Sequence, residues 1–135
     1  MRDMREINDR AARASIREER LRATAGLREP GLSSWRGRSG RRYVVGVHAL
    51  SEADLADLTG AVLIAVGRNG DGTAKLLSVA APRPTTSPRV RLRWLSRVRS
   101  RGATEMHVHR LAEDEKERQA IVADLDTPAT TDAAA

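Results

Sequence analysis

Alternating apolar and polar positions are clearest in the middle of the chain, where they predict three strands. In residues 42–49 (RYVVGVHA) every second side chain falls on the same side, as in a half-buried strand. Residues 61–67 (AVLIAVG) and 74–80 (AKLLSVA) are apolar, β-rich runs. The NGDG sequence between them supplies residues that tolerate a positive φ, as a hairpin turn requires. The pattern therefore predicts a strand followed by a β-hairpin.

Two longer segments are typical of helices. Residues 89–101 (RVRLRWLSRVRSR) are followed by Gly102, at a position typical of a C-cap glycine. The apolar residues of the stretch 89–95 also alternate, so a strand is the alternative there, but the length of the segment favours a helix. Residues 104–110 alternate again as a strand. Residues 113–126 begin with acids, as the first turn of a helix does.

These elements predict an α+β domain over residues 42–126. Its core is a small three- to four-stranded mixed sheet, packed by two helices. The sheet would consist of the first strand, the β-hairpin and a strand that follows a crossover helix. A short helix is expected over residues 51–58, where Ser51 and Asp54 resemble a capping box.

The segments on either side of this domain differ from it in composition. Residues 1–25 hold no glycine or proline, and several acids precede an arginine by four positions, so we predict a charged helical arm. Residues 26–41 are rich in Gly, Ser and Arg and predict a linker that contains Trp35. Residues 127–135 are expected to be disordered.

Positive charge gathers in two blocks around a neutral core. The chain has 24 Lys+Arg against 18 Asp+Glu, a net charge of +6. Residues 1–42 hold twelve arginines against six acids, and residues 83–110 hold eight arginines against Glu105 alone. Such blocks are typical of polyanion binders, although a GC-rich genome would produce the same arginine bias without functional meaning. The residues that we predict to contact nucleic acid are Trp35, Arg36, Arg38, Arg41, Arg42, Arg91, Arg93, Arg97 and Arg101.

The composition excludes several other kinds of site. Cysteine is absent, which removes disulfides, thiol catalysis and cysteine-bound metals. No apolar run approaches the roughly 20 residues of a membrane span, and the first residues (MRDMREINDR) do not resemble a secretory signal, so we expect a cytoplasmic protein. His48, His107 and His109 could form a metal site, but we favour a solvent-facing position for His107 and His109. No metal or cofactor is expected.

The segments AVLIAV, LLSVA and GATEMHVHRLAEDEKERQAIVADLD, with the helix between the last two, resemble the GIY-YIG nuclease domain over about residues 61–126. In active members, hairpin tyrosines, a helix arginine and a final-helix glutamate that binds a divalent metal carry phosphodiester hydrolysis. Here Leu63 and either Leu77 or Ser78 stand near the tyrosine positions, and Val122 stands where the glutamate would be. The resemblance therefore implies a degenerate, non-catalytic copy.

The sequence thus predicts a non-catalytic accessory protein that binds DNA or RNA through arginines on a degenerate GIY-YIG-like scaffold. The alternative is a protein–protein interaction module whose N-terminal arm orders on a partner, for example an acidic protein. A metal-dependent nuclease is the least favoured hypothesis. No membrane partner is expected.

Overall fold

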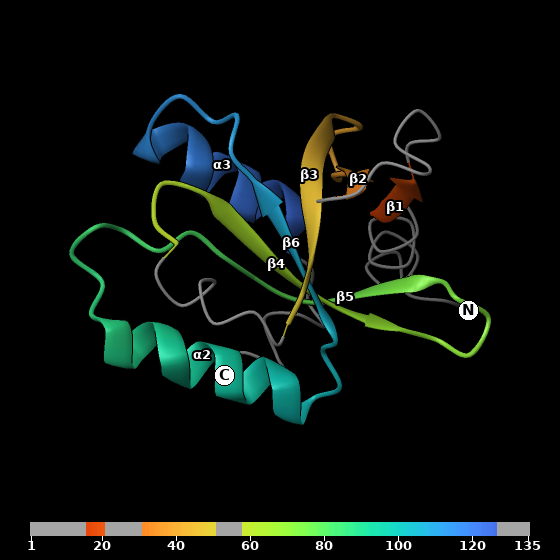
Figure 1. The fold of residues 1–135 in the computed structure, drawn as a ribbon. Coiled ribbons are helices and arrows are strands. Elements are labelled where there is room, and N and C mark those ends of the chain that lie inside the picture. The colour runs from red at the N-terminus through yellow and green to blue at the C-terminus, as the bar shows by residue number, and fades with distance from the viewer. Residues whose placement is uncertain (1–15, 21–30, 51–57, 127–135) are drawn as a thin grey trace, which may run out of the picture.

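A computed structural model of the chain describes residues 16–20, 31–50 and 58–126. Within these ranges the chain forms one sheet and two helices (Figure 1). The elements are β1 (Arg17–Arg20), β2 (Gly31–Arg36), β3 (Arg42–Ala49), β4 (Val62–Arg68), β5 (Ala74–Ala80), α2 (Pro88–Ser100), β6 (Glu105–His109) and α3 (Glu115–Leu125).

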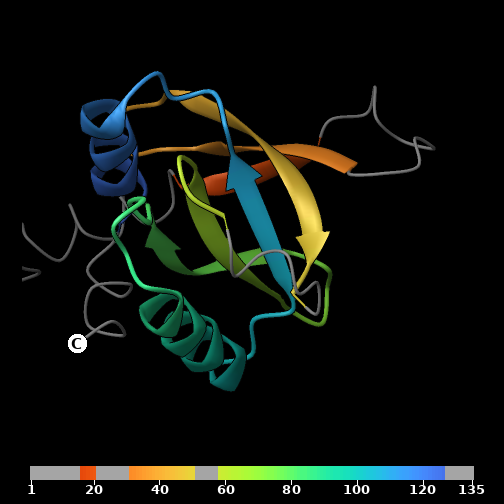
Figure 2. The same cartoon turned by 60° about the vertical axis from the view of Figure 1, so that its left-hand side comes forward.

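The described sheet has six strands in the order β1-β2-β3-β6-β4-β5, and every neighbouring pair is antiparallel. The sheet curls so that its edge strand β1 comes near the opposite edge strand β5 (Figure 2). Strands β5 and β6 both pair with β4, and α2 connects them as a crossover. The curl gives the sheet an inner and an outer face, which are covered by different helices.

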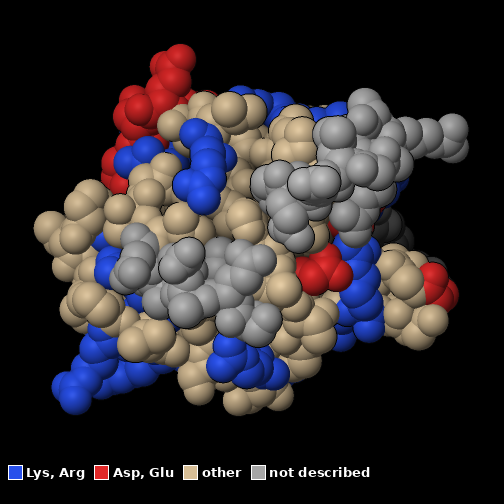
Figure 3. Space-filling view, viewed as in Figure 1, with Lys and Arg blue, Asp and Glu red and all other residues tan. Residues whose placement is uncertain are grey.

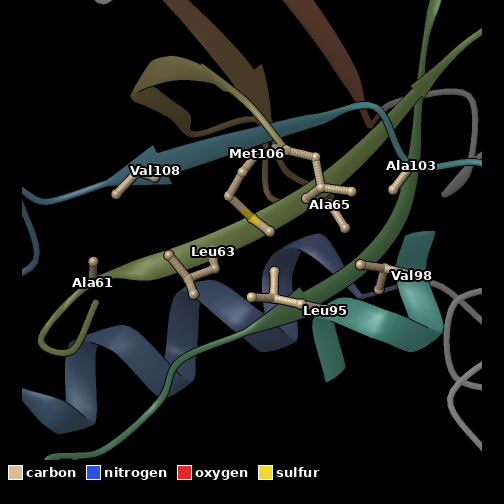
Figure 4. Close-up of a cluster of buried hydrophobic side chains, with 9 residues drawn as sticks. Ala61, Leu63, Ala65, Leu95, Val98, Ala103, Met106 and Val108 are labelled. Atoms are coloured by element: carbon tan, nitrogen blue, oxygen red, sulfur yellow. The ribbon is translucent and has the colours of Figure 1, made fainter. Parts of the chain in front are cut away.

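The outer face is covered by α2. Leu95 and Val98 of this helix pack against Leu63 of β4 and Met106 of β6 (Figure 4). Ser87 caps the start of α2 by accepting a hydrogen bond from the backbone N–H of Val90, 3.2 Å away. The burial of two apolar residues three positions apart fixes which side of α2 faces solvent.

The inner face is covered by α3. Ile121 and Leu125 of this helix pack against a cluster that includes Trp35 of β2 and Ile64 of β4. Consecutive residues of β4 are buried on opposite faces, which explains why its sequence is a continuous apolar run and does not alternate. Asp114 caps α3 by accepting a hydrogen bond from the backbone N–H of Glu117, at 2.8 Å.

The structure confirms the strands, the hairpin and both helices predicted between residues 42 and 126. Gly72, in the turn between β4 and β5, has a φ of +85°, and Gly102 follows α2 with a φ of +99°. The alternative strand over residues 89–95 is wrong, because these residues lie in α2. The short helix expected over residues 51–58 falls almost entirely outside the described residues, as does the tail over 127–135.

The predicted sheet was too small and of the wrong kind. The described sheet has six antiparallel strands where three or four mixed ones were expected. The two additional strands, β1 and β2, come from the segments predicted as a helical arm (residues 1–25) and a linker (residues 26–41). The described part of that arm, Arg17–Arg20, is a strand. Ion pairs between residues four apart contribute only about 0.2–0.5 kcal/mol to a helix, which tertiary pairing easily overrides.

Besides its backbone pairing with β2, strand β1 is linked to the opposite side of the curl by charge. The guanidinium of Arg68, at the end of β4, donates to both carboxylate oxygens of Glu18 in β1, at 2.8 and 3.1 Å. The same guanidinium also donates to both oxygens of Glu105 in β6, at 2.8 and 2.9 Å. Because Glu18 is only 8% exposed, these bonds replace water around a buried carboxylate. Arg68 therefore joins three strands across the inside of the curl.

No helix among the residues described is long and apolar enough to cross a membrane.

Replacing Arg68 by methionine is expected to destabilise the fold strongly. It would leave two largely buried carboxylates without their cation, a loss that typically costs about 3 kcal/mol or more. The matched control is Arg83→Met, because Arg83 is 62% exposed and its 3.0 Å pair with Glu115 lies at the surface. Such pairs contribute roughly 1 kcal/mol or less. Urea unfolding followed by circular dichroism measures both; equal small losses would contradict the role given to Arg68.

Candidate nucleic-acid interface

Helix α2 presents a dense arginine surface to solvent. No acid occurs between its first and last residue. Figure 3 shows basic side chains along the lower edge of the molecule, where Figure 1 places α2, and acidic side chains at the upper left. The arginines of this surface are Arg89, Arg91, Arg93, Arg97 and Arg99 of α2 and Arg101 directly after it.

Three arginines of this surface differ from many of the other described arginines in their ion pairs. No ion pair within the described ranges involves Arg93, Arg97 or Arg101. Elsewhere the arginines form ion pairs: Arg17, Arg36 and Arg42 with Glu19, Arg68 with Glu18 and Glu105, and Arg83 and Arg118 with Glu115. The charges of Arg93, Arg97 and Arg101 are therefore available to an external anion.

Arg93, Arg97 and Arg101 follow one another at intervals of four residues, so they form a row along one side of α2. Each step advances about 6 Å along the helix axis. Arg91 lies closer to the body of the protein, where its guanidinium donates to the backbone carbonyl of Thr86 at 2.7 Å. The arginine surface of α2 thus consists of the exposed row and of Arg91, which is held against the loop before the helix.

The second predicted block, around the turn between β2 and β3, lies elsewhere. Arg38 donates to the carbonyl of Ala123 in α3 at 2.6 Å, and Arg41 stacks over the ring of Tyr43. Figures 1 and 2 both show this turn beside α3, far from α2. Of the predicted contact residues, Arg91, Arg93, Arg97 and Arg101 are therefore brought together, and Arg36, Arg38, Arg41 and Arg42 form a separate group.

Trp35 is not placed to stack on a nucleic-acid base, because it is only 1% exposed. Its indole N–H donates to Nδ1 of His107 at 2.9 Å, inside the curled sheet. An indole nitrogen is only a donor, so Nδ1 of His107 must be unprotonated and its Nε2 carries the proton. That Nε2 lies 2.9 Å from Oε1 of Glu105 and donates to it. The chain Trp35–His107–Glu105 then continues to Arg68.

The prediction that His107 and His109 face solvent is also wrong. His107 is completely buried and His109 is 5% exposed, because α3 covers the inner face on which they lie. Burial lowers the pKa of His107, which agrees with the neutral form required by Trp35. Hydrogen bonds from Arg68 hold the pKa of Glu105 at about 2, against the opposite effect of its burial.

The pKa of Glu18 is also shifted by the cluster around it. Its burial acts to raise its pKa, but the hydrogen bond and charge of Arg68 and a hydrogen bond from Ser33 hold that pKa below its usual value. No buried side-chain nitrogen or oxygen among the described residues lacks a hydrogen-bond partner. With its members mostly buried and hydrogen-bonded to one another, this cluster stabilises the curl.

No metal site is found in the part of the chain that the structure describes, since no three His, Asp or Glu side chains there are grouped to hold an ion. His48 lies on the outer face of β3, away from the two inner histidines. Asp124 of α3, close in sequence to Val122, is engaged by the Tyr43 hydroxyl at 2.6 Å and the Ser39 hydroxyl at 2.7 Å. Burial and the bond to Asp124 raise the pKa of Tyr43 to about 12.

Comparison with known protein families, curated proteins and solved structures finds no match. The resemblance to GIY-YIG domains stays a prediction.

Sequence reasoning missed the cluster inside the sheet. Its members, Glu18, Trp35, Arg68 and Glu105, lie on four strands and share no local motif. One signal was available: Trp35 and Tyr43 flank a Gly-Arg-Ser-Gly sequence, which is a hairpin turn signal. Trp35 and Tyr43 are indeed cross-strand partners in the structure.

The stability of the protein is expected to fall as the pH is lowered below neutrality. The pKa of His107 is depressed on folding, so below about its ordinary value of 6.5 the unfolded chain binds the proton more readily. Glu18 and Glu105, also depressed, act in the same direction below about 4.5. Urea unfolding between about pH 8 and pH 5 measures the loss.

A nitrogen-15 NMR titration of the imidazoles assigns this effect to His107. At about pH 6 its ring should still be neutral and protonated at Nε2. A His107 ring that titrates at its ordinary pKa, or a stability independent of pH over this range, would contradict the assignment.

Proposed function

We propose that this chain is a non-catalytic accessory protein that binds nucleic acid through the arginine surface of α2. The observation that carries the proposal is the row Arg93, Arg97 and Arg101, which is exposed and has no acidic partner among the described residues. Like charges at this spacing disfavour an isolated helix, and bound phosphates would relieve that repulsion. The planar guanidinium also fits phosphate oxygens in a bidentate manner.

The position of α2 supports the same function. The helix is anchored to the sheet by Leu95 and Val98, so its outward side is held on a rigid element. Phosphate contacts give affinity without sequence information. The proposal therefore concerns binding to the backbone of DNA or RNA and assigns no base sequence.

The absence of catalysis is part of the proposal. Asp124, the carboxylate of α3 nearest to the position where the GIY-YIG resemblance would require a metal ligand, accepts hydrogen bonds from Tyr43 and Ser39. Val122 offers no oxygen for a hard cation. These residues support a binding role for the fold and give it no group for hydrolysis.

The alternative is a protein-interaction module that uses the N-terminal arm, and it is tested by a truncation that leaves the sheet intact. Removing residues 1–42 would delete β1, β2 and the buried Trp35, so the rest of the sheet would lose its support. A truncation that tests the arm has to stop before Ile16, which packs against the inner core. Loss of a co-purifying protein on removal of residues 1–15, with nucleic-acid binding absent, would favour this alternative.

The double substitution Arg93→Gln, Arg97→Gln is expected to weaken nucleic-acid binding in a salt-dependent manner. If each arginine neutralises one phosphate, the slope of log K against log salt should fall by roughly 1.5 to 2. Fluorescence anisotropy with a labelled oligonucleotide, between about 50 and 200 mM salt, measures the slope.

The matched control is Arg41→Gln, Arg42→Gln at the turn between β2 and β3, which removes the same charge from the other basic group. It should change the slope much less. Equal effects of the two double variants would mean that net charge alone drives binding. Binding by the wild type that does not depend on salt would contradict the proposal altogether.

A further inference from the structure

An apolar groove runs beside the arginine row, between α2 and the edge of the sheet at β5. Its first part is a cleft of about 180 Å³ lined by Leu63, Ala80, Pro82, Val90 and Trp94. A second cleft, also of about 180 Å³, is lined by Ser78, Ala80, Trp94 and Val98. Trp94 borders both clefts, so its indole stands between them. The two clefts also share Ala80 and Arg97, so they lie next to each other along the side of the helix, and together they are called the groove below.

The indole of Trp94 is held in place by a hydrogen bond. Its N–H donates to the Ser78 hydroxyl in β5 at 3.0 Å. The side chain is half-buried and packs at the rim of the outer core, so it is neither free to rotate nor hidden. A fixed, partly exposed aromatic ring is the kind of surface on which an unpaired base stacks.

Arginines border the same groove. Arg97 lines both clefts, Arg91 lines the first and Arg101 lines the second. The groove therefore has an apolar floor with an aromatic ring and a cationic rim along its length. This charge pattern is complementary to a strand whose bases are apolar on their faces and whose backbone is anionic.

We propose that this groove binds single-stranded nucleic acid, with one base on Trp94 and the neighbouring phosphates on Arg97 and Arg101. The inference rests on the proposed function and names the form of nucleic acid that α2 takes. Each cleft is smaller than the roughly 300–1,000 Å³ typical of sites that enclose a whole small ligand. A base that belongs to a longer strand needs to bury only its own ring, while its phosphates stay outside.

A duplex fits this site less well. Its base faces are covered by stacking within the helix, so the indole would find no partner in it. The arginine row would still meet the phosphates of a duplex, because backbone contacts need no exposed base. The distinguishing property is therefore the ratio of affinities for single-stranded and duplex forms of the same sequence.

Trp94→Leu is expected to lower this ratio about tenfold or more, as the loss of one base–aromatic stack does. The full-length protein is titrated into a labelled oligonucleotide of about 12 nucleotides, alone and annealed to its complement, with anisotropy as the readout. Leu92→Ala is the matched control. Leu92 is an exposed apolar residue of the same helix, about 200° around the axis from Trp94, and its loss should leave the ratio unchanged.

A second measurement requires no variant that affects folding. Trp35 is buried, so quenching of tryptophan emission in the wild type reports mainly on Trp94. At equal occupancy, single strands should quench the emission and duplex should not. Equal affinity for both forms would overturn the proposal that the groove binds single strands. So would an affinity ratio that Trp94→Leu leaves unchanged, together with no quenching. Either result would leave the proposal for the arginine surface intact. Failure to bind either form would overturn both proposals.

Discussion

The guanidinium of Arg68 lies inside the curled sheet and has two carboxylates from two other strands as its partners. Strand β1 has the sequence REER, pairs with β2 through its backbone, and has only Ile16 beside it as an apolar contact with the inner core. The bonds from Arg68 to Glu18 add a link from β1 to β4 across the curl, and those to Glu105 hold the end of β6. Glu105 also accepts a hydrogen bond from Nε2–H of His107, and Nδ1 of His107 accepts one from the indole of Trp35. One hydrogen-bonded chain therefore connects Arg68 to Trp35 across the inner face, beside the apolar cluster under α3.

The central part of the fold could be predicted because its signals are local. The alternation of β3, the turn between β4 and β5 and the cap of α2 each lie within about ten neighbouring residues. Strands β1 and β2 could not be found in this way. The acids and arginines of β1 are equally good in a helix, and Ser33 and Ser34 of β2 are buried polar residues that a hydrophobic pattern does not mark. Arg68, the partner of Glu18 in β1, and His107, the partner of Trp35 in β2, are distant in sequence and become visible only in the fold.

In the candidate site, too, features set by local spacing could be predicted and features set by the fold could not. The exposed row on α2 follows from helical spacing, so Arg93, Arg97 and Arg101 could be chosen from the sequence. Trp35, chosen because arginines surround it, is an interior residue, since clustering of charge in the sequence does not show which way a side chain points. Trp94 lies in the predicted helix 89–101, and the structure places it at the edge of the core beside two clefts. The fold separates the two basic blocks and leaves α2 as the surface that combines an exposed arginine row with an aromatic groove.

The central claim is that nucleic acid binds along α2 and the adjacent edge of β5. The most direct test is a titration of the nitrogen-15-labelled protein with a short single-stranded oligonucleotide, followed by the backbone amide resonances. Shifts concentrated in residues 78–101, with the indole N–H of Trp94 among the largest, are the predicted result. Shifts confined to the turn between β2 and β3, or to the chain outside 78–101, would contradict the account.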